Sequence, residues 1–205
     1  RKGGAVHIGL LEAVRQNWAD VIGYTDTDIS IDLRLLGSLL APLYKKESGV
    51  AIASRWMEGA SAENMSLLGR VSSEAYNRCV GTFLPPLRDI KDTQRGLKLF
   101  DKAVIEKILP FSKDMGLAFD SELLLLAILA GYKISEIPVA YFESNKASTV
   151  KAFSDGPKML KELWRQREHI RDPFKLSPSI IAEQAAQKEL QETVKTKVEE
   201  IITEV

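Results

Sequence analysis

The sequence predicts an α/β fold in which helices flank a mixed, mainly parallel central sheet. Segments with helical spacing of apolar residues alternate along the chain with short apolar segments typical of buried strands. The composition, with 45% apolar and 27% charged residues, is that of a globular protein. A length of 205 residues fits one domain with an appendage, so we expect a domain over residues 1–165 and a charged helical extension over 166–205.

The expected helices follow from apolar residues at helical spacing and from their flanking start and stop signals. In chain order they cover residues 4–18, 33–44, 67–83, 101–109 and 123–130. Asp32 can cap the second of these, and Pro42 should kink it or end it early. Pro85 and Pro86 stop the third, and Gly131 ends the last.

The expected strands lie between these helices, over residues 21–24, 49–54, 96–100 and 133–142. The first two are short apolar segments bounded by polar residues, a pattern typical of strands buried on both faces. The other two alternate apolar and polar residues, and Pro138 in the last predicts a place at the sheet edge. Residues 57–66 are expected to form a loop. Ligands bind α/β sheets at the carboxyl ends of strands, where Asp26, Asp28 and Arg55 stand.

Charge and composition argue against several classes of function. The 28 basic and 28 acidic residues leave no net charge, so nucleic acid is not an expected partner. The single cysteine permits no internal disulfide, and with only two histidines it argues against a Cys/His zinc site. The longest apolar run, residues 123–130, is far shorter than the about 20 residues needed to span a bilayer.

Asp26 and Asp28 are two carboxylates separated by one residue, directly after an expected strand. Such a pair can hold Mg²⁺ or Mn²⁺ against the phosphates of a substrate, because Mg²⁺ is usually bound by one or two carboxylates plus phosphate oxygens. A nucleotide-diphosphate site needs that arrangement. The alternative is that either side chain merely caps a turn, since this spacing is common.

Arg55 and Arg70 are candidates for binding phosphate, because the planar guanidinium group matches phosphate geometry. Arg70 opens an expected helix that carries Ser72 and Ser73, whose hydroxyl groups could add donors for an anion. The alternative for each arginine is a surface salt bridge.

Two further polar segments can have either a functional or a purely structural role. Residues 88–95, which include Asp92 and Gln94, form a dense charged stretch that is either solvated or beside a site. Asp120 precedes the strongly apolar expected helix. It can act as a general base or as the N-cap of that helix, and the frequency of such caps favours the cap.

In their order along the chain, these motifs resemble those of the family 2 glycosyltransferases. The most similar branch makes dolichyl- or polyprenyl-phosphate mannose or glucose, and the resemblance covers residues 1–165. The matching segments are residues 2–5, 26–28, 52–56, 70–73, 88–100, 118–124 and 137–139. The sequences at 92–100, Asp-Thr-Gln-Arg-Gly-Leu-Lys-Leu-Phe, and at 119–124, Phe-Asp-Ser-Glu-Leu-Leu, are the most specific to this branch.

The resemblance implies a GT-A fold and an inverting transfer of a sugar from a nucleotide-sugar donor to a lipid-linked phosphate acceptor. It also implies three groups of site residues, which differ in their roles. They are Asp26 and Asp28 for Mg²⁺ or Mn²⁺ on the donor diphosphate, Arg55, Arg70 and Ser73 for the donor diphosphate and the acceptor phosphate, and Asp92 and Gln94 for the lining of the site.

The chemistry of the reaction agrees with this set. The leaving group is a nucleoside diphosphate, and a divalent cation neutralises its developing charge. A phosphate monoester has a second pKa of about 6, so it is already anionic at neutral pH and needs no general base. If the acceptor were a sugar or protein hydroxyl, Asp120 would be the best candidate for the base. A third alternative is a non-catalytic α/β binding module.

The start of the chain departs from the family. Such enzymes normally begin with a strand and loop that hold the nucleotide base and ribose, and that segment would lie upstream of Arg1. We therefore expect roughly the first third of the catalytic domain to be absent, with an exposed sheet edge and little activity from these residues alone.

A lipid-linked acceptor requires the protein to approach a membrane. Residues 151–175 carry seven Lys or Arg against four Asp or Glu, with Phe153, Leu163 and Trp164 among them. Anionic headgroups attract such segments, so this stretch is the candidate membrane face, and an ordinary amphipathic core helix is the alternative. We accordingly expect the protein in the cytoplasm or on the cytoplasmic face of a membrane, with residues 180–205 as a solvated helix.

Overall fold

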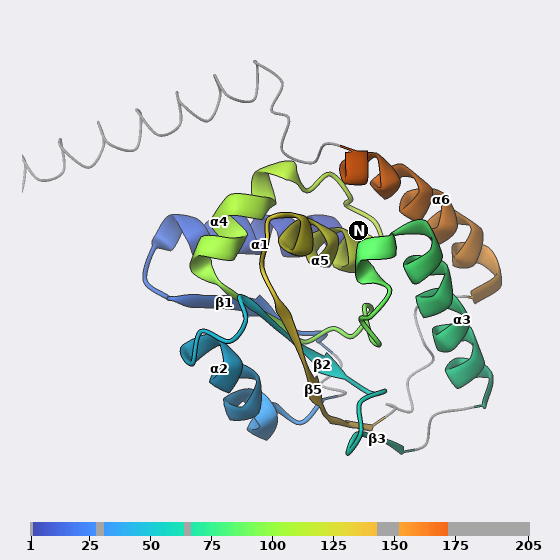
Figure 1. Ribbon diagram of the computed structural model, residues 1–205, viewed down its shortest axis with the longest axis horizontal. Coiled ribbons are helices and arrows are strands. Elements are labelled where there is room, and N and C mark those ends of the chain that lie inside the picture. The colour runs from blue at the N-terminus through green and yellow to red at the C-terminus, as the bar shows by residue number, and fades with distance from the viewer. Residues whose placement is uncertain (1, 28–30, 64–66, 143–151, 172–205) are drawn as a thin grey trace, which may run out of the picture. The chain divides into compact units, whose positions relative to one another are not determined.

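The computed structural model describes residues 2–27, 31–63, 67–142 and 152–171, which Figure 1 draws in colour. By its internal contacts the chain divides into two units, residues 1–173 and 174–205, and every described residue belongs to the first. Most of the expected extension over residues 166–205 lies outside the described residues. The expected division into domains therefore stays a prediction.

Within the described residues, the main sheet has four strands. Their order is β1 (Val21–Tyr24), β4 (Lys98–Asp101), β2 (Val50–Ser54) and β5 (Ile134–Pro138). β4 pairs antiparallel with both β1 and β2, whereas β2 and β5 are parallel. Three strands therefore run in one direction and β4 runs against them, which confirms the expected mixed sheet. β5 lies at the edge, as Pro138 predicts.

The central, reversed place of β4 does not follow from the alternation of helices and strands. Because β4 lies between β1 and β2, only one of the three hydrogen-bonded strand pairs described in this sheet is parallel. Strand order depends on which faces can be buried together, and segments far apart in the sequence decide that.

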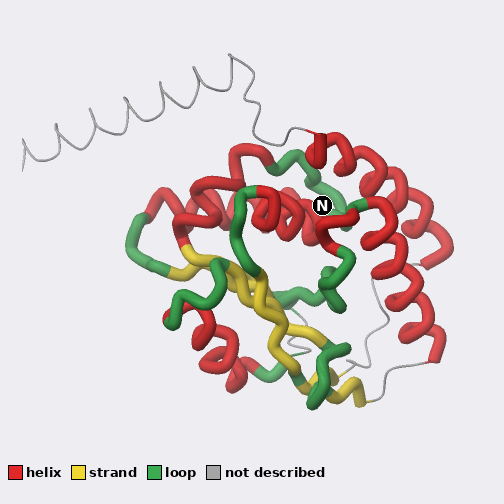
Figure 2. Tube along the Cα trace, in the orientation of Figure 1, coloured by secondary structure: helices red, strands yellow, loops and turns green. Residues whose placement is uncertain are grey.

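Helices cover both faces of this sheet (Figures 1 and 2). One layer contains α1 (Lys2–Gln16), α4 (Lys102–Ile108) and α5 (Phe119–Leu129), and the other contains α2 (Leu36–Tyr44). Successive side chains of a strand point to opposite faces, and this explains the division. Ile52 and Phe100 pack in the first layer, whereas Ala51 and Ala53 pack against the residues of α2.

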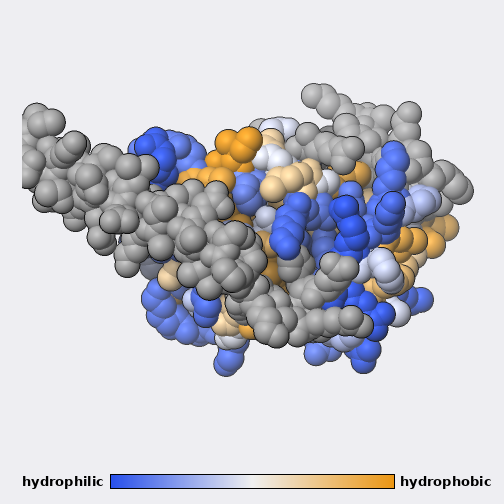
Figure 3. All heavy atoms as spheres, turned by 90° about the horizontal axis from the view of Figure 1, so that it is seen from above, coloured by the Kyte–Doolittle hydropathy of each residue, from blue (hydrophilic) through white to orange (hydrophobic). Residues whose placement is uncertain are grey.

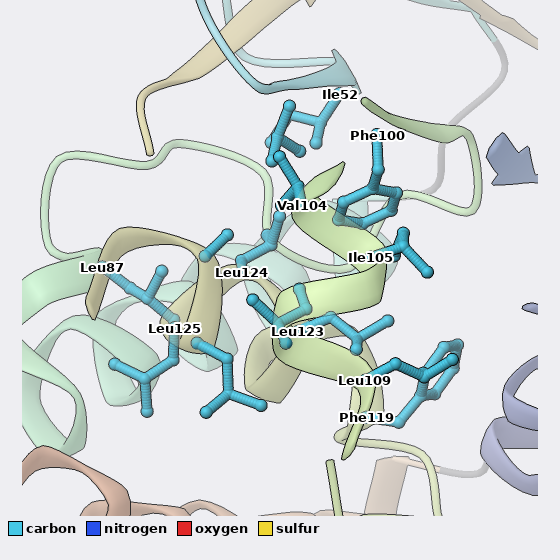
Figure 4. Packing of buried hydrophobic residues seen from close by; sticks show 14 of the residues in the cluster. Ile52, Leu87, Phe100, Val104, Ile105, Leu109, Phe119, Leu123, Leu124 and Leu125 are labelled. Atoms are coloured by element: carbon cyan, nitrogen blue, oxygen red, sulfur yellow. The ribbon is translucent and has the colours of Figure 1, made fainter. Parts of the chain in front are cut away.

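The main core lies between the sheet, α4 and α5, and Figure 4 shows its packing. Phe100 of β4 is fully buried beside Val104 and Ile105 of α4. α5 is buried at every position over residues 119–127, polar residues included. A helix enclosed in this way must find partners for its polar side chains inside the protein, and Asp120 is one of them.

α3 (Leu67–Phe83) and α6 (Ala152–Arg171) pack side by side, on the right in Figure 1. The bounds of α3 are those that the sequence predicts. The segment expected to be a loop, residues 57–66, contains instead the short strand β3 (Ser61–Glu63). β3 pairs in parallel with β6 (Ala140–Phe142), which follows β5, so part of that expectation is wrong. The pairing partner lies almost 80 residues away, beyond the reach of a local pattern.

The described elements also include three short 3-10 helices, η1 (Leu33–Leu35), η2 (Pro85–Leu87) and η3 (Leu109–Phe111). Asp32 caps η1, where its side chain accepts a hydrogen bond from the backbone N–H of Arg34 at 2.9 Å. Of the two outcomes expected for Pro42, the early end is wrong, because α2 continues beyond this buried residue, and the kink stays a prediction. Leu39 and Leu43 are fully buried against the sheet and stabilise the last turn despite the missing N–H.

The surface of the described residues is mixed in character. On the face shown in Figure 3, hydrophilic side chains (blue) cover most of the described area and smaller apolar areas (orange) lie between them. Exposed large apolar side chains include Ile8 and Leu11 on α1 and Trp164 on α6. Within the described ranges, no helix combines the length and apolarity that crossing a bilayer requires.

Candidate active site

Two clusters of polar side chains meet at residues 92–98, the segment that leads into β4. The acid cluster contains Lys2, Tyr24, Asp26, Arg95, Lys98 and Asp120. The arginine cluster contains Arg55, Trp56, Arg70, Ser73 and Asp92. This segment contributes Asp92 to the arginine cluster and both Arg95 and Lys98 to the acid cluster.

Asp26 follows β1 and presents a partly exposed carboxylate to two cations. Lys2 Nζ lies 2.7 Å from Asp26 Oδ1, and Arg95 Nη2 lies 3.9 Å from Oδ2. Gly96 packs against the same carboxylate so closely that a Cβ atom at this position would overlap it. A glycine is therefore required at residue 96 if Asp26 is to keep this orientation.

The backbone at the start of α1 brings Lys2 to Asp26. The N–H of Gly3 donates to the carbonyl of Gly116, and the N–H of Gly4 donates to that of Met115, each at 3.2 Å. A Cβ atom at Gly3 would lie 2.8 Å from the Gly116 carbonyl oxygen, so only glycine permits this approach. The Lys-Gly-Gly segment thereby delivers the Lys2 ammonium to the acid cluster.

The residues present fit a cation held jointly by the protein and a substrate. Asp28, the second acid of the expected pair, lies outside the described residues. The Asp26 carboxylate is an oxygen ligand of the type that Mg²⁺ takes, and in this structure it is paired with Lys2 and Arg95. Among the described residues, no group of three or more His, Cys, Asp or Glu could hold a metal ion by itself. Phosphate oxygens of a substrate would complete such a site.

Asp120 is an ion-pair partner in the core, and the expectation that it caps its helix is wrong. The N-cap of α5 is Ala118, and Asp120 lies inside the first turn with 1% of its surface exposed. Its Oδ1 accepts from Tyr24 Oη and from Lys98 Nζ, each at 2.6 Å. Tyr24 and Lys98 are directly opposite each other on β1 and β4, so the antiparallel pairing brings both groups to one carboxylate.

Burial and charge determine the pKa shifts in the acid cluster. Burial lowers the pKa of Lys98, and the Asp120 carboxylate opposes that shift. Burial, with the charge of Asp120, raises the pKa of Tyr24 well above its ordinary value, so this hydroxyl remains a donor. Burial also acts to lower the pKa of Lys2, but Asp120 and Asp26 outweigh it and the pKa is raised. Lys2 is therefore an ammonium group at neutral pH.

The arginine cluster is organised around a bidentate ion pair. Arg55 donates from Nε to Asp92 Oδ2 at 2.8 Å and from Nη2 to Asp92 Oδ1 at 2.9 Å. The same Nη2 lies 3.0 Å from Ser73 Oγ on α3. Asp92 is fully buried, and its backbone N–H donates to Glu136 of β5 at 3.0 Å. Asp92 and Ser73 thus hold the Arg55 guanidinium group in one orientation, and Glu136 in turn holds the backbone of Asp92.

Two other expected site residues, Arg70 and Gln94, differ in their contacts. The guanidinium group of Arg70 lies over the Trp56 ring, 6.0 Å from its centroid, and its side chain is exposed. Gln94 has a buried Nε2 with no hydrogen-bond partner in the part of the chain that the structure describes. The structure thus brings Arg55, Ser73 and Asp92 together, and the binding roles assigned to all these residues stay predictions.

Comparison with known proteins places this geometry in a family, although no protein-family model matches the chain. The chain is 35% identical over 138 residues to glycosyltransferase AglD of Haloferax volcanii, covering 67% of the chain and 21% of that protein. It is 33% identical over 171 residues to dolichyl-phosphate beta-glucosyltransferase of Saccharomyces cerevisiae, covering 79% of the chain and 50% of that protein. The chain belongs to the family 2 glycosyltransferases. It spans half or less of the length of these curated relatives.

Solved structures confirm the GT-A fold of this glycosyltransferase. Glucosyl-3-phosphoglycerate synthase from Mycobacterium tuberculosis, in complex with Mn²⁺, UDP-glucose and phosphoglyceric acid, superposes with a TM-score of 0.57. The match covers 79% of this chain and 55% of that one at 14% identity. Another complex of the same enzyme, with UDP, gives a TM-score of 0.56 at 13% identity. At such identities the likeness establishes the fold.

Several residues of the two clusters received no role from the sequence. Lys2 and Lys98 lie within segments that carry the family resemblance, but neither received a role from the sequence. Lys98 is a polar residue of an alternating strand, a pattern typical of one face in solvent, but it is fully buried beside Asp120. The sequence did contain one indication of a role for Lys98, since this lysine lies within the motif at residues 92–100 that is specific to the family. Trp56, directly after Arg55, was likewise unassigned.

Proposed function

We propose that this protein transfers a sugar, in an inverting reaction, from a nucleotide-sugar donor to a dolichyl or polyprenyl phosphate, with Mg²⁺ or Mn²⁺ bound. The observation that carries the proposal is that Asp120, the candidate base, is buried and already bonded to other side chains. A hydroxyl acceptor needs a base, but the Asp120 carboxylate is buried and accepts hydrogen bonds from Tyr24 and Lys98. A phosphate acceptor is anionic at neutral pH and needs none. The names of the yeast and Drosophila melanogaster relatives, dolichyl-phosphate beta-glucosyltransferases, support the same acceptor and favour glucose as the sugar.

The acid cluster serves the donor in this proposal. Asp26, with Asp28, would hold the cation against the donor diphosphate, where it neutralises charge on the leaving group. Lys2 and Arg95 already lie beside Asp26 and supply further positive charge to the same diphosphate. Because the Lys2 pKa is raised, this ammonium keeps its charge at neutral pH.

The arginine cluster serves the acceptor. Two anionic phosphate groups approach each other during the transfer, so the site must supply positive charge to seat the second one. Arg70 supplies this charge, and the Arg55 guanidinium group, whose charge Asp92 balances, adds hydrogen-bond donors that Asp92 and Ser73 hold in place. Gln94, with an unpartnered buried Nε2 among the described residues, can donate one further hydrogen bond.

An acceptor comparison tests the function. The full-length protein that contains this chain, given Mn²⁺ or Mg²⁺ and UDP-glucose, is expected to glucosylate a short polyprenyl phosphate and to leave the matched polyprenol unmodified. Lipid product is measured by thin-layer chromatography with radiolabelled donor, and a chelator provides the metal-free control. Equal transfer to the alcohol would contradict the proposal, as would the absence of transfer from every nucleotide sugar tried.

Contact with the bilayer is a further part of the proposed function, and α6 is its candidate element. One face of α6 packs inward through Met159 and Leu163, as the alternative of an amphipathic core helix requires. The remaining surface exposes Leu160 and Trp164. Exposed basic side chains accompany them at Lys158, Lys161, Arg165 and Arg167. We infer that this exposed face lies on anionic headgroups, because apolar and basic groups together favour that boundary.

Charge reversal tests the membrane face. Replacing Lys158, Lys161 and Arg165 with glutamate is expected to reduce cosedimentation with anionic liposomes by about tenfold or more, since each basic group near the surface contributes about 1 kcal/mol. The matched control reverses three exposed lysines outside α6, Lys45, Lys113 and Lys133. Equal loss in both triple variants, or no loss in the first, would refute the assignment of this face.

A further inference from the structure

Trp56 carries contacts that the proposed function leaves unexplained. It follows Arg55 at the end of β2. The Arg55 guanidinium carbon lies 5.4 Å from the centroid of its ring, and that of Arg70 lies 6.0 Å from the same ring. Both distances are within the about 6 Å over which a cation is attracted to an indole. One ring therefore links two guanidinium groups from separate elements, the end of β2 and α3.

The two guanidinium groups differ in how they are held. Arg55 is neutralised by the bidentate contact with Asp92. Arg70 has no carboxylate within ion-pair distance among the described residues, and its contact within that part of the chain is the Trp56 ring. The cluster therefore carries excess positive charge beside the ring, which an anion would balance.

The indole nitrogen of Trp56 is the second observation. Nε1 is buried, and it has no hydrogen-bond partner in the part of the chain that the structure describes. A buried donor without an acceptor is unfavourable, and most such groups in proteins are paired. An N–H group that lacks an acceptor among the described residues, beside two guanidinium groups, is suited to a ligand that brings its own acceptor oxygen.

We propose that Trp56 is a binding residue for the phosphate group of the acceptor. Its ring holds the guanidinium groups of Arg55 and Arg70 in place, and its Nε1–H donates a hydrogen bond to a phosphoryl oxygen. The inference rests on the proposed function, since it names a further residue of the same acceptor site. The ligand class is a phosphate monoester, and the experiment below separates the acceptor phosphate from the donor diphosphate.

A binding experiment tests this role without requiring catalysis. The protein has three tryptophans, and Trp18 and Trp164 are 83% and 60% exposed, so a W18F/W164F variant leaves Trp56 as the only tryptophan. Titration with a water-soluble short-chain prenyl phosphate is expected to change its fluorescence saturably, and the matching alcohol is expected to change nothing. An R70Q substitution in this background should weaken the response. The proposal would be overturned if Trp56 fluorescence stayed constant at prenyl phosphate concentrations that calorimetry shows to be saturating. A fluorescence change with UDP-glucose alone would overturn it as well.

Steady-state kinetics separate the two parts of the role. W56F keeps a ring for stacking but lacks the N–H, and it is expected to raise the KM for prenyl phosphate about tenfold, the order of one hydrogen bond to a charged group. W56L loses both features and should raise this KM further, with the KM for the donor unchanged in both variants. W18F is the control. An equal rise in both KM values, or no rise in either, would overturn the assignment. If even the wild type transfers no sugar, the proposed function fails, and the fluorescence result still decides the role of Trp56.

Discussion

Replacing Asp26 with asparagine is expected to lower kcat/KM for sugar transfer by about 100-fold or more, the effect of losing one preorganised electrostatic group at a leaving diphosphate. The amide keeps the size of the side chain but loses the charge that a cation requires. Initial rates over a range of Mn²⁺ concentrations measure the loss, and electron paramagnetic resonance of bound Mn²⁺ reports metal binding separately. D20N is the matched control, because Asp20 is an exposed acid just before β1.

A second variant reaches the same carboxylate without removing its charge. G96A introduces a Cβ atom where the Asp26 carboxylate now lies, so Asp26 must turn away while the backbone can remain in place. We expect weakened Mn²⁺ binding and a near-normal melting temperature. G37A is its control, because a Cβ atom at Gly37 meets nothing within 4 Å. Full activity in D26N, or unchanged Mn²⁺ binding in both D26N and G96A, would show that Asp26 does not hold the cation.

Replacing Asp120 with asparagine is expected to lower the free energy of unfolding by about 3–5 kcal/mol, because it leaves the buried Lys98 ammonium without its carboxylate. Denaturant titration of the purified protein measures the change. The double variant K98M/D120N removes both charges and should recover most of the loss, since a buried ion pair is often replaceable by apolar groups of similar size. The excess of the two single effects over the double effect gives the energy of the pair.

The same double variant separates stability from catalysis. If Asp120 only anchors Lys98 and Tyr24, K98M/D120N should retain transfer to polyprenyl phosphate within about tenfold of the wild type, far less than the 10²–10⁴-fold contribution of a general base. Loss of all transfer in this double variant, when it unfolds at the same denaturant concentration as the wild type and K98M alone retains transfer, would assign Asp120 as the base. The acceptor would then be a hydroxyl group, and the proposed phosphate acceptor would be wrong.

Local patterns in the sequence determined the elements and much of the candidate site. The helix over residues 67–83 and the buried strand ending at Arg55 were predictable because apolar spacing and proline act within a few residues. The family motifs likewise pointed to Arg55, Ser73 and Asp92, which the fold brings into contact. Chain order alone could not reveal that Asp92 fixes Arg55, because 37 residues separate them.

Only the tertiary structure decided the partners of the buried charges. Lys98 alternates with apolar residues, a pattern typical of a strand with one face in solvent, yet the reversed β4 places it opposite Tyr24 and in an ion pair with Asp120. Tyr24 and Asp120 lie 96 residues apart in the sequence and 2.6 Å apart in the fold. Sequence by itself therefore determined which side chains could carry the chemistry. The fold decided which are held by other protein groups and which can meet a substrate, because burial and ion pairing arise from contacts between distant segments.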